Sequence, residues 1–468
     1  MVDTNKKNGS QVISLTVSVQ RARDIASAIA SAEMSADRVG LQVSVAQAKR
    51  AGRSSLTPKS KDPSNLGRAT ESMLQYLPQV LRNTDALNTC ETVMSTRVGA
   101  AAFIDISGFT RLSSRFEEFP NGADLVAKII NGLFEEAHTI IEHYNGDVLK
   151  FHGDAVTVWF DNPADAALCS WRITRELHEH PTGLENLTLS FHAGIGYGDG
   201  VICQLGDAKR RELLLRGTSI LQAAQSEKHA GAGMVVTSRS CFDEIQAGMD
   251  GFRGQPIGEG GEFISLDNVP DGSTVKSDRA TISDPKYSQL DLQWAASFLP
   301  HTLLDRIKRD MPMCELRHLT IAFAFVVGSE CDLDSLSQLA CTAQRLGRQH
   351  GGEMNKISLD DKGYNMLVVF GMPPDDLAAD TPSRAISTFW EILRATPLKI
   401  NVGIATGLAY CGICGGTRRQ EFTVLGNPVN FAARLAGAGQ AMGADILVDK
   451  VTRDLARLAD VCWFINTP

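Results

Sequence analysis

The sequence lacks a long apolar run, a secretory signal and an excess of positive charge. No uninterrupted apolar segment among the 468 residues approaches the ~18 to 20 residues needed to span a bilayer. The N-terminus also lacks the charged-then-apolar pattern of a secretory signal. The formal net charge of −8 at pH 7 argues against nucleic acid as the main partner. We therefore expect an intracellular, cytoplasmic protein with no transmembrane span.

The cysteines are too scattered to form a disulfide framework. There are ten of them, and an intracellular setting keeps such thiols reduced. Only Cys411 and Cys414 stand close together, and no second pair lies at the spacing of a zinc site. We interpret this pair as small apolar residues of a strand and turn, with a redox or metal pair as the alternative.

Composition indicates a folded protein with an unusual N-terminus. Hydrophobic residues make up 43% and charged residues 21%, as in soluble globular proteins, and the length allows two or three domains. Residues 1–70 differ, because up to Asp62 they carry ten Lys or Arg against five Asp or Glu. We expect a basic, flexible or partly helical extension. Its acids count against a targeting peptide, which is the alternative and would direct the protein to an organelle.

A duplication is the most informative pattern in the chain. VGAAAFIDISGFT and GDVLKFHGDAVTVWF recur, altered, as LRHLTIAFAFVVG and GEMNKISLDDKGYNMLVVF. ELLLRGTSILQAAQ recurs as EFTVLGNPVNFAAR at a constant offset (421 − 212 = 209 and 426 − 217 = 209). The chain therefore contains two related domains.

The two copies have lost opposite halves of one site. The first keeps two carboxylates, Asp105 and Asp154, where the second has Phe325 and no acid at a matching turn. The second keeps four polar residues: Lys356, Thr423, Asn430 and Arg434. At the positions equivalent to the last three, the first copy has Leu214, Leu221 and Gln225. Such complementary loss predicts a single composite catalytic site at the interface of the two domains.

Each copy shows the βαββαβ order of a ferredoxin-like domain. In the first copy we expect strands and helices, in chain order, over 100–106, 122–144, 148–151, 155–160, 165–180 and 187–198. This order predicts an α+β fold with helices on one face of an antiparallel sheet.

The domain boundaries follow from composition. We place the first domain at 71–265, a linker rich in Pro, Gly, Ser and Asp at 266–290, and the second domain at 291–468. The second copy has no counterpart to the strand GEFISLD of the first. Either the chain is a fragment, or that edge of the sheet is completed differently.

The segment around Asp105 suits a polyphosphate. A strand ends at this carboxylate and is followed by the turn Ile106-Ser107-Gly108-Phe109-Thr110 and a helix. Backbone N–H groups of such a turn can bind phosphate oxygens while the carboxylate holds a divalent cation. Asp154 lies on the neighbouring hairpin turn. Two carboxylates on adjacent strands predict a two-metal site for phosphoryl chemistry.

FIDISGFT, LKFHGDA and FTVLGNPVNFAAR closely resemble motifs of the class III nucleotidyl cyclases, above all the soluble tandem-domain adenylyl cyclases of the bicarbonate-responsive type. The resemblance covers roughly residues 72 to 465. It implies that Asp105 and Asp154 hold two Mg²⁺ ions, replaceable by Mn²⁺, with the Ile106 carbonyl as a further ligand. It also implies roles for four residues of the second copy: adenine recognition by Lys356 and Thr423, ribose orientation by Asn430 and charge stabilisation in the transition state by Arg434.

Physical chemistry supports these roles independently. A Lys ammonium only donates hydrogen bonds and a Thr hydroxyl can accept one, so Lys356 and Thr423 complement adenine, whereas guanine presents the reverse pattern. Asn430 and Arg434 are four residues apart and share one face of a helix that begins near Pro428. The apolar neighbours of Arg434 predict that this helix is largely buried.

Two positions depart from the pattern of the family, and one strand carries alternating glycines. His192 stands where the closest relatives carry a phosphate-binding lysine, and a neutral imidazole there predicts weaker or pH-dependent triphosphate binding. Lys150 matches a lysine of the relatives' bicarbonate pocket, but Ala224 stands at the arginine position. Bicarbonate activation therefore stays open, with Lys150 as a candidate effector residue. The alternating glycines Gly194, Gly196, Gly198 and Gly200 lack dinucleotide spacing, and we expect them to bring a strand end and turn close to the substrate.

The sequence thus predicts an adenylyl cyclase that converts ATP to 3′,5′-cyclic AMP and pyrophosphate, built as an intramolecular pseudo-dimer. Two alternatives stay open. One is a guanylyl cyclase, against which Lys356 and Thr423 argue. The other is a catalytically inactive nucleotide-binding regulator.

Overall fold

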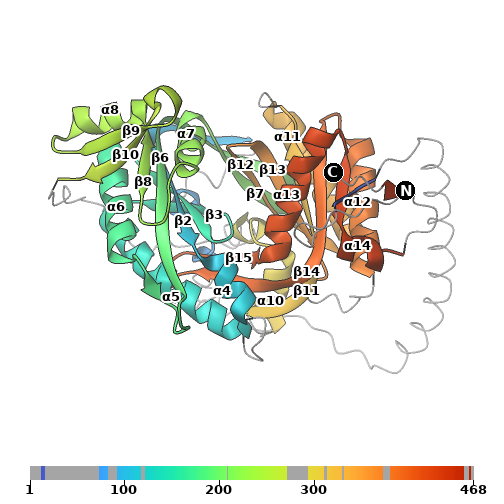
Figure 1. Cartoon of the computed structure of the whole chain (residues 1–468). Helices are drawn as coiled ribbons and strands as arrows, with labels where there is room; N and C mark the ends of the chain where they lie inside the picture. Colours follow the sequence, from blue (N-terminus) through green and yellow to red (C-terminus); the bar gives the residue numbers. More distant parts are fainter. Residues whose placement is uncertain are drawn as a thin grey trace, which may run out of the picture.

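The computed structural model describes residues 12–15, 73–82, 92–116, 122–207, 209–270, 294–309, 314–328, 331–372, 380–457 and 463–464. Two α+β domains lie side by side, the first drawn in blue to green and the second in yellow to red (Figure 1). The expected linker at 266–290 falls largely outside the described residues, and the domain boundaries stay predictions. Among the described helices, none is long and apolar enough to cross a membrane.

The first domain is built on a mixed sheet with strand order β3-β4-β2-β6-β8-β10-β9, and β7 also pairs with β6. The short helix α3 (Gln79–Arg82) precedes it. Its elements are β2 (Val93–Ser107), α4 (Phe109–Phe116), α5 (Gly122–His143), β3 (Asp147–Phe151), β4 (Ala155–Phe160), α6 (Pro163–Glu176), β5 (His180–Pro181), β6 (Thr188–Asp207), β7 (Arg210–Arg216), α7 (Thr218–Glu227), β8 (Val235–Ser238), α8 (Arg239–Gly248), β9 (Arg253–Ile257), the short 3-10 helix η2 (Glu259–Gly261) and β10 (Phe263–Asn268).

The second domain repeats this plan with strand order β12-β13-β11-β14-β16-β1-β17, and β15 pairs with β14. Its elements are α10 (His301–Arg309), β11 (Cys314–Val326), α11 (Leu333–Gln349), β12 (Gly352–Asp360), β13 (Gly363–Phe370), α12 (Thr381–Ala395), β14 (Ile400–Gly415), β15 (Gln420–Leu425), α13 (Asn427–Met442), β16 (Ile446–Asp449), α14 (Lys450–Leu455) and β17 (Trp463–Phe464). The predicted α+β fold with two ferredoxin-like domains is confirmed.

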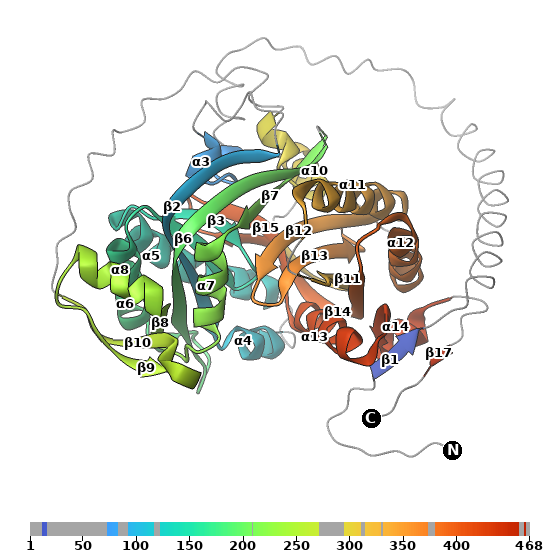
Figure 2. The ribbon, with the colours of Figure 1, turned by 90° about the horizontal axis from the view of Figure 1, so that it is seen from above.

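The edge that the second copy lacks is completed from the N-terminus. Strand β1 (Val12–Leu15) pairs antiparallel with β16, and β17 pairs with β1 (Figure 2). In the first domain, β10 pairs in the same way with β8 and β9 with β10. The N-terminal extension therefore contains a strand of the second domain's sheet. The rest of the extension up to residue 72 lies outside the described residues.

Each domain also extends a hairpin that packs on a helix of the other domain. The end of the β14–β15 hairpin lies on α5 of the first domain, where Asn131 Nδ2 donates to the carbonyl of Ile413 at 3.2 Å. In return, the β6–β7 hairpin lies on α11, where the backbone N–H of Gly206 donates to Ser337 Oγ at 3.4 Å. Between the hairpins, a single apolar cluster joins buried residues of both copies, among them Phe103 and Trp159 of the first and Ile321 and Val424 of the second. The two domains therefore share a core.

Two of the alternating glycines, Gly194 and Gly196, allow close packing of a helix on the sheet. A Cβ on Gly194 would collide with the backbone N of Glu227, and one on Gly196 would collide with the carbonyl of Ser219. Only glycine therefore lets α7 lie directly on β6. Gly403 has the same role under α13, where a Cβ would meet the carbonyl of Ala432.

Candidate active site

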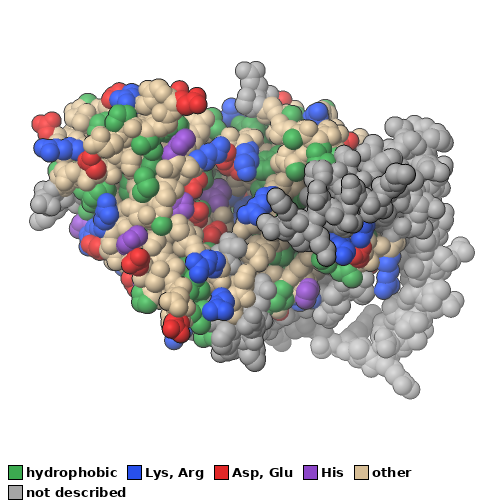
Figure 3. All heavy atoms as spheres, in the orientation of Figure 1, with side chains coloured by type: hydrophobic (Ala, Val, Ile, Leu, Met, Phe, Trp, Pro, Cys, Tyr) green, Lys and Arg blue, Asp and Glu red, His purple; other side chains and the backbone are tan. Residues whose placement is uncertain are grey.

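The two carboxylates of the first copy lie together at one edge of the domain interface. Asp105 stands near the end of β2, paired in register with Ala155 of β4 and His192 of β6, and Asp154 occupies the turn just before β4. Both residues are partly buried. In space-filling view, acidic and histidine side chains gather in a hollow between the two domains (Figure 3).

The electrostatics of this pair fit a bound cation. Burial raises the pKa of Asp105 to about 6, and the positive charge of His192 partly opposes this effect. Burial and then the charge of Asp105 raise the pKa of Asp154 well above its usual range. Neighbouring carboxylates that disfavour each other's charge attract a divalent cation, and their hard oxygens suit Mg²⁺ or Mn²⁺. The residues present therefore fit the implied metal, with Asp105, Asp154 and the Ile106 carbonyl as candidate ligands.

The predicted phosphate-binding turn leads directly into α4. Gly108 has φ of +101°, and a Cβ there would lie 2.9 Å from the carbonyl of Thr188, so the turn requires glycine. Phe109 and Thr110 form the first turn of α4. Ser107 instead turns its hydroxyl to His192, with 3.0 Å between Oγ and Nδ1.

The predicted adenine-binding residues contact each other and reach the first domain. Lys356 Nζ donates to Thr423 Oγ1 at 2.9 Å and to the carbonyl of Phe151 at 2.9 Å. Glu421 lies 3.6 Å from the same ammonium. Phe151 ends β3, shortly before Asp154 in the same hairpin. The structure therefore brings the polar half of the site next to the carboxylate half.

Asn430 and Arg434 lie on α13, but not on a buried face. The helix buries Ala432, Leu435 and Ala436 on one side, and both polar residues are exposed on the other. The expectation that this helix is largely buried therefore holds only for the face that packs on β14, and Arg434 lies on the other face. The start of α13 meets the first domain, where Asn427 Nδ2 donates to Ser114 Oγ of α4 at 3.0 Å.

His192 is held between acids. Its Nε2 lies 2.9 Å from Glu227 Oε1 and 3.7 Å from Asp105 Oδ2. Burial lowers its pKa, but the hydrogen bond to Glu227 and the charges of Asp105 and Glu227 outweigh burial and raise the pKa overall. The imidazole at this position therefore binds a proton more readily than a free histidine does. Glu227 was missed by sequence reasoning, and the signal that could have found it is Gly194, which brings α7 onto β6 beside His192.

Lys150, the candidate effector residue, is fully engaged. Its Nζ donates to the carbonyls of Leu213 and Ile357, each at 2.5 Å, and lies 3.9 Å from Glu212. Burial lowers the pKa of this ammonium. Ala224 is buried in α7. An effector role for Lys150 stays a prediction.

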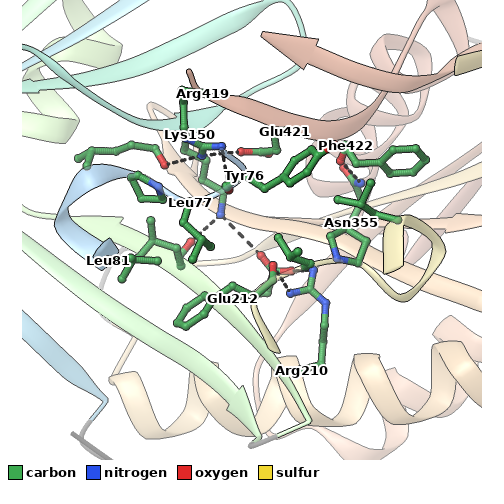
Figure 4. A pocket seen from close by; sticks show the side chains of 17 residues that line it. Tyr76, Leu77, Leu81, Lys150, Arg210, Glu212, Asn355, Arg419, Glu421 and Phe422 are labelled. Atoms are coloured by element: carbon green, nitrogen blue, oxygen red, sulfur yellow. Dashed lines mark hydrogen bonds and ion pairs between the residues drawn. The ribbon is translucent and has the colours of Figure 1, made fainter. Parts of the chain in front are cut away.

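Lys150 also lines a small cavity of about 50 Å³ between the domains (Figure 4). Arg210 and Glu212 of β7 line it together with Arg419 and Glu421 of β15. These two pairs are separated by the same offset as the duplicated motifs (419 − 210 = 209). The cavity therefore lies where equivalent elements of the two domains meet.

One expectation about the second copy was wrong. Its hairpin between β12 and β13 does carry acids, Asp360 and Asp361. Asp360 accepts hydrogen bonds from the N–H of Lys362 at 2.8 Å and from Asn365 Nδ2 at 2.9 Å, and Asp361 forms an ion pair with Lys228 of the first domain. Both carboxylates have protein partners. At the position equivalent to Asp105, the second copy has Phe325.

Comparison with known proteins agrees with this architecture. Residues 333–459 match the family model described as the adenylate and guanylate cyclase catalytic domain. In its duplicated fold, its paired carboxylates and this match, the chain is similar to the class III nucleotidyl cyclases.

Two curated relatives are the adenylate cyclase type 10 proteins of Mus musculus, 27% identical over 381 residues, and of Homo sapiens, 24% identical over 408 residues. Each alignment covers 72% of this chain but only 23% of the relative, so the chain spans about a quarter of their length. A crystal structure of a class III adenylyl cyclase-like ATP-binding protein from Pseudomonas aeruginosa aligns over 86% of this chain and 94% of its own, with a TM-score of 0.50 and 12% identity. That likeness concerns the fold alone.

Proposed function

We propose that this chain is an adenylyl cyclase that converts ATP to 3′,5′-cyclic AMP and pyrophosphate in intracellular signalling. The observation that carries the proposal is the contact of Lys356 with the carbonyl of Phe151, 2.9 Å away and in the hairpin that ends at Asp154. Through this contact, the second domain presents base-reading groups beside the metal-binding groups of the first. The two domains act as an intramolecular pseudo-dimer with a single complete site.

Lys356 and Thr423 select adenine. The Lys356 ammonium donates to a ring nitrogen of the base, and Thr423 Oγ1 accepts from the exocyclic amine. Both groups are buried, at 6% and 0% exposure, so a guanine that mismatches them costs about 1 to 3 kcal/mol per group.

The remaining residues hold the ATP triphosphate and ribose. Asp105 and Asp154 would hold Mg²⁺ or Mn²⁺, which would lower the pKa of the ribose 3′ hydroxyl and neutralise charge on the leaving pyrophosphate. The turn at 107–110 binds phosphate oxygens, and Asn430 orients the ribose so that O3′ lies in line with the α-phosphorus. The bond from O3′ to phosphorus forms as the bond to pyrophosphate breaks, and the hydroxyl proton passes to solvent. Arg434 stabilises the developing negative charge. Within the described part of the chain, no side chain pairs with it.

Cyclic nucleotide production by the purified chain tests this function. ATP and GTP are supplied in parallel, with Mg²⁺ or Mn²⁺ and with or without bicarbonate. We expect cyclic AMP from ATP, a loss of at least a hundredfold in Asp105→Asn and full activity in Asp250→Asn, an exposed acid outside the site. Cyclic GMP as the main product would instead support a guanylyl cyclase.

An ATP-binding protein without turnover is the second candidate. Two observations favour it: His192 is already held by two acids, and the structurally similar Pseudomonas aeruginosa protein is described as adenylyl cyclase-like and ATP-binding. ATP binding measured by calorimetry, with no product under either metal, would support this candidate and overturn the cyclase.

A further inference from the structure

We propose that His192 and Glu227 join Asp105 in a metal site with one nitrogen and two oxygen ligands, which selects Mn²⁺ and related first-row ions over Mg²⁺. This inference uses one acid of the proposed cyclase site but does not require turnover.

The three side chains already have the geometry of a ligand set. Their candidate ligand atoms all lie within 4.8 Å of one another. His192 Nε2 is 2.9 Å from Glu227 Oε1 and 3.7 Å from Asp105 Oδ2. Metal bonds of about 2.0 to 2.2 Å separate adjacent ligand atoms by roughly 3 to 4 Å, so an ion fits with small side-chain movements.

The surroundings fix each ligand. Ser107 Oγ lies 3.0 Å from His192 Nδ1, which orients the ring and turns Nε2 toward the acids. Gly194 lets α7 lie on β6, which places Glu227 beside the ring. The carboxyl side chains of Asp105 and Glu227 retain 29% and 28% exposure, so an ion can reach them from the cleft.

The second domain provides an internal comparison. At the equivalent backbone positions it carries Phe325 for Asp105, Asn401 for His192 and Ala436 for Glu227. Because Asn401 and Ala436 occupy the same β14–α13 packing, the fold itself needs neither an imidazole nor a third acid. The ligand set belongs only to the domain that bears the two carboxylates.

Ligand chemistry gives the selectivity. Mg²⁺ prefers oxygen ligands and keeps several waters, whereas an imidazole nitrogen suits first-row transition-metal ions. Among these ions, Mn²⁺ also suits the two carboxylates of this ligand set. Mn²⁺ is the better probe here, because it is paramagnetic and its ligands can be identified by EPR, whereas Zn²⁺ gives no EPR signal.

The test measures Mn²⁺ binding to the full chain without nucleotide, by calorimetry and by pulsed EPR, which detects a nitrogen bonded to the ion. We expect nitrogen coupling and Mn²⁺ binding at least tenfold tighter than Mg²⁺ binding. His192→Asn and Glu227→Ala copy the second domain, so both variants are expected to fold. Each weakens Mn²⁺ binding about 10- to 100-fold and changes Mg²⁺ binding less than threefold, and His192→Asn removes the nitrogen coupling.

His229→Asn, which alters an exposed histidine, controls for unspecific coordination and is expected to bind Mn²⁺ like the natural chain. Unchanged Mn²⁺ affinity and no nitrogen coupling in the natural chain would overturn the inference, leaving an ion-paired histidine. The cyclase proposal would survive that result if Asp105→Asn still abolished turnover.

Discussion

At the residue scale, Thr423 is the sharpest test of base recognition. Its side chain is fully buried, and its hydroxyl accepts from Lys356 at 2.9 Å. Thr423→Val keeps the shape of the side chain but removes the acceptor for the adenine amine. We expect kcat/KM for ATP to fall roughly 10- to 100-fold and discrimination against GTP to weaken.

Thr320→Val is the matched control. Thr320 is equally buried, and its hydroxyl bonds to Thr381 and Thr406, away from the proposed site. We expect this variant to lose stability but to keep its preference for ATP. Equal losses of discrimination in both variants would contradict the assigned role of Thr423.

Single residues also show where sequence reasoning ends. The motifs identified Asp105, Asp154, Lys356 and Thr423 because each stands in a recurring local pattern. Glu227 has no such pattern, since its place beside His192 depends on how closely α7 packs against β6. The exposure of Arg434 likewise depends on which face of α13 meets β14, and the apolar residues beside it in the sequence do not identify that face.

At the scale of elements, the β14–β15 hairpin is anchored by a buried arginine. Arg419 donates to the carbonyls of Tyr76 at 2.9 Å, Val148 at 3.1 Å and Leu149 at 3.2 Å. Arg419→Met removes the donor from these carbonyls and the nearby positive charge from Glu421. We expect a loss of about 3 to 5 kcal/mol in the free energy of unfolding, measured in urea.

The neighbouring Arg418 provides a control within the same turn. Its side chain is 68% exposed and pairs with Glu142 at the surface. Arg418→Met is therefore expected to change the free energy of unfolding by less than about 1 kcal/mol. A similar loss in both variants would show that the turn, rather than the buried guanidinium, sets stability.

Helix α5 is expected to make the interface sensitive to acid. Burial, reinforced by the charge of Arg419, lowers the pKa of His138 to about 4. The unfolded chain takes up a proton near pH 6.5 that folded His138 refuses, so this contribution to stability is lost as pH falls from about 6.5 to 4. Between pH 7 and 4.5 the loss is about 2 to 3 kcal/mol, and His138→Asn is expected to remove it.

The measurement is urea unfolding at several pH values, compared between variants because other groups titrate in the same range. His143→Asn, on the same helix but exposed, is the control. If the natural chain and His138→Asn lost stability in parallel, the assigned cause would be wrong.

The sequence predicted the helices and strands far better than the contacts between the two domains. Periodicity and turn residues located the six βαββαβ elements of the first copy. Neither hairpin contact with the opposite domain, at Asn131 and at Gly206, was foreseen, because each bond joins segments distant in sequence.

At the scale of the whole molecule, the N-terminal strand completes the second domain. Val12 to Leu15 pair with Asp449 to Ile446 and cover an edge that would otherwise leave unpaired backbone groups. Deleting residues 1–16 is expected to lower the melting temperature and to promote aggregation through the edge of β16. A peptide of residues 8–20 added in trans is expected to restore stability, as measured by thermal melting and light scattering. A truncated chain as stable and monomeric as the full one would contradict this role.

The pairing of β1 with β16 also has a consequence for biosynthesis. The strand that leaves the ribosome first must wait for partners near the opposite end of the chain, at residues 446–449 and 463–464. The first domain has all its strands in one stretch and can fold during translation, whereas the second sheet closes only after its C-terminal strands emerge. A stalled or C-terminally shortened product therefore keeps β1 unpaired, so pairing of this strand reports that synthesis has reached β16.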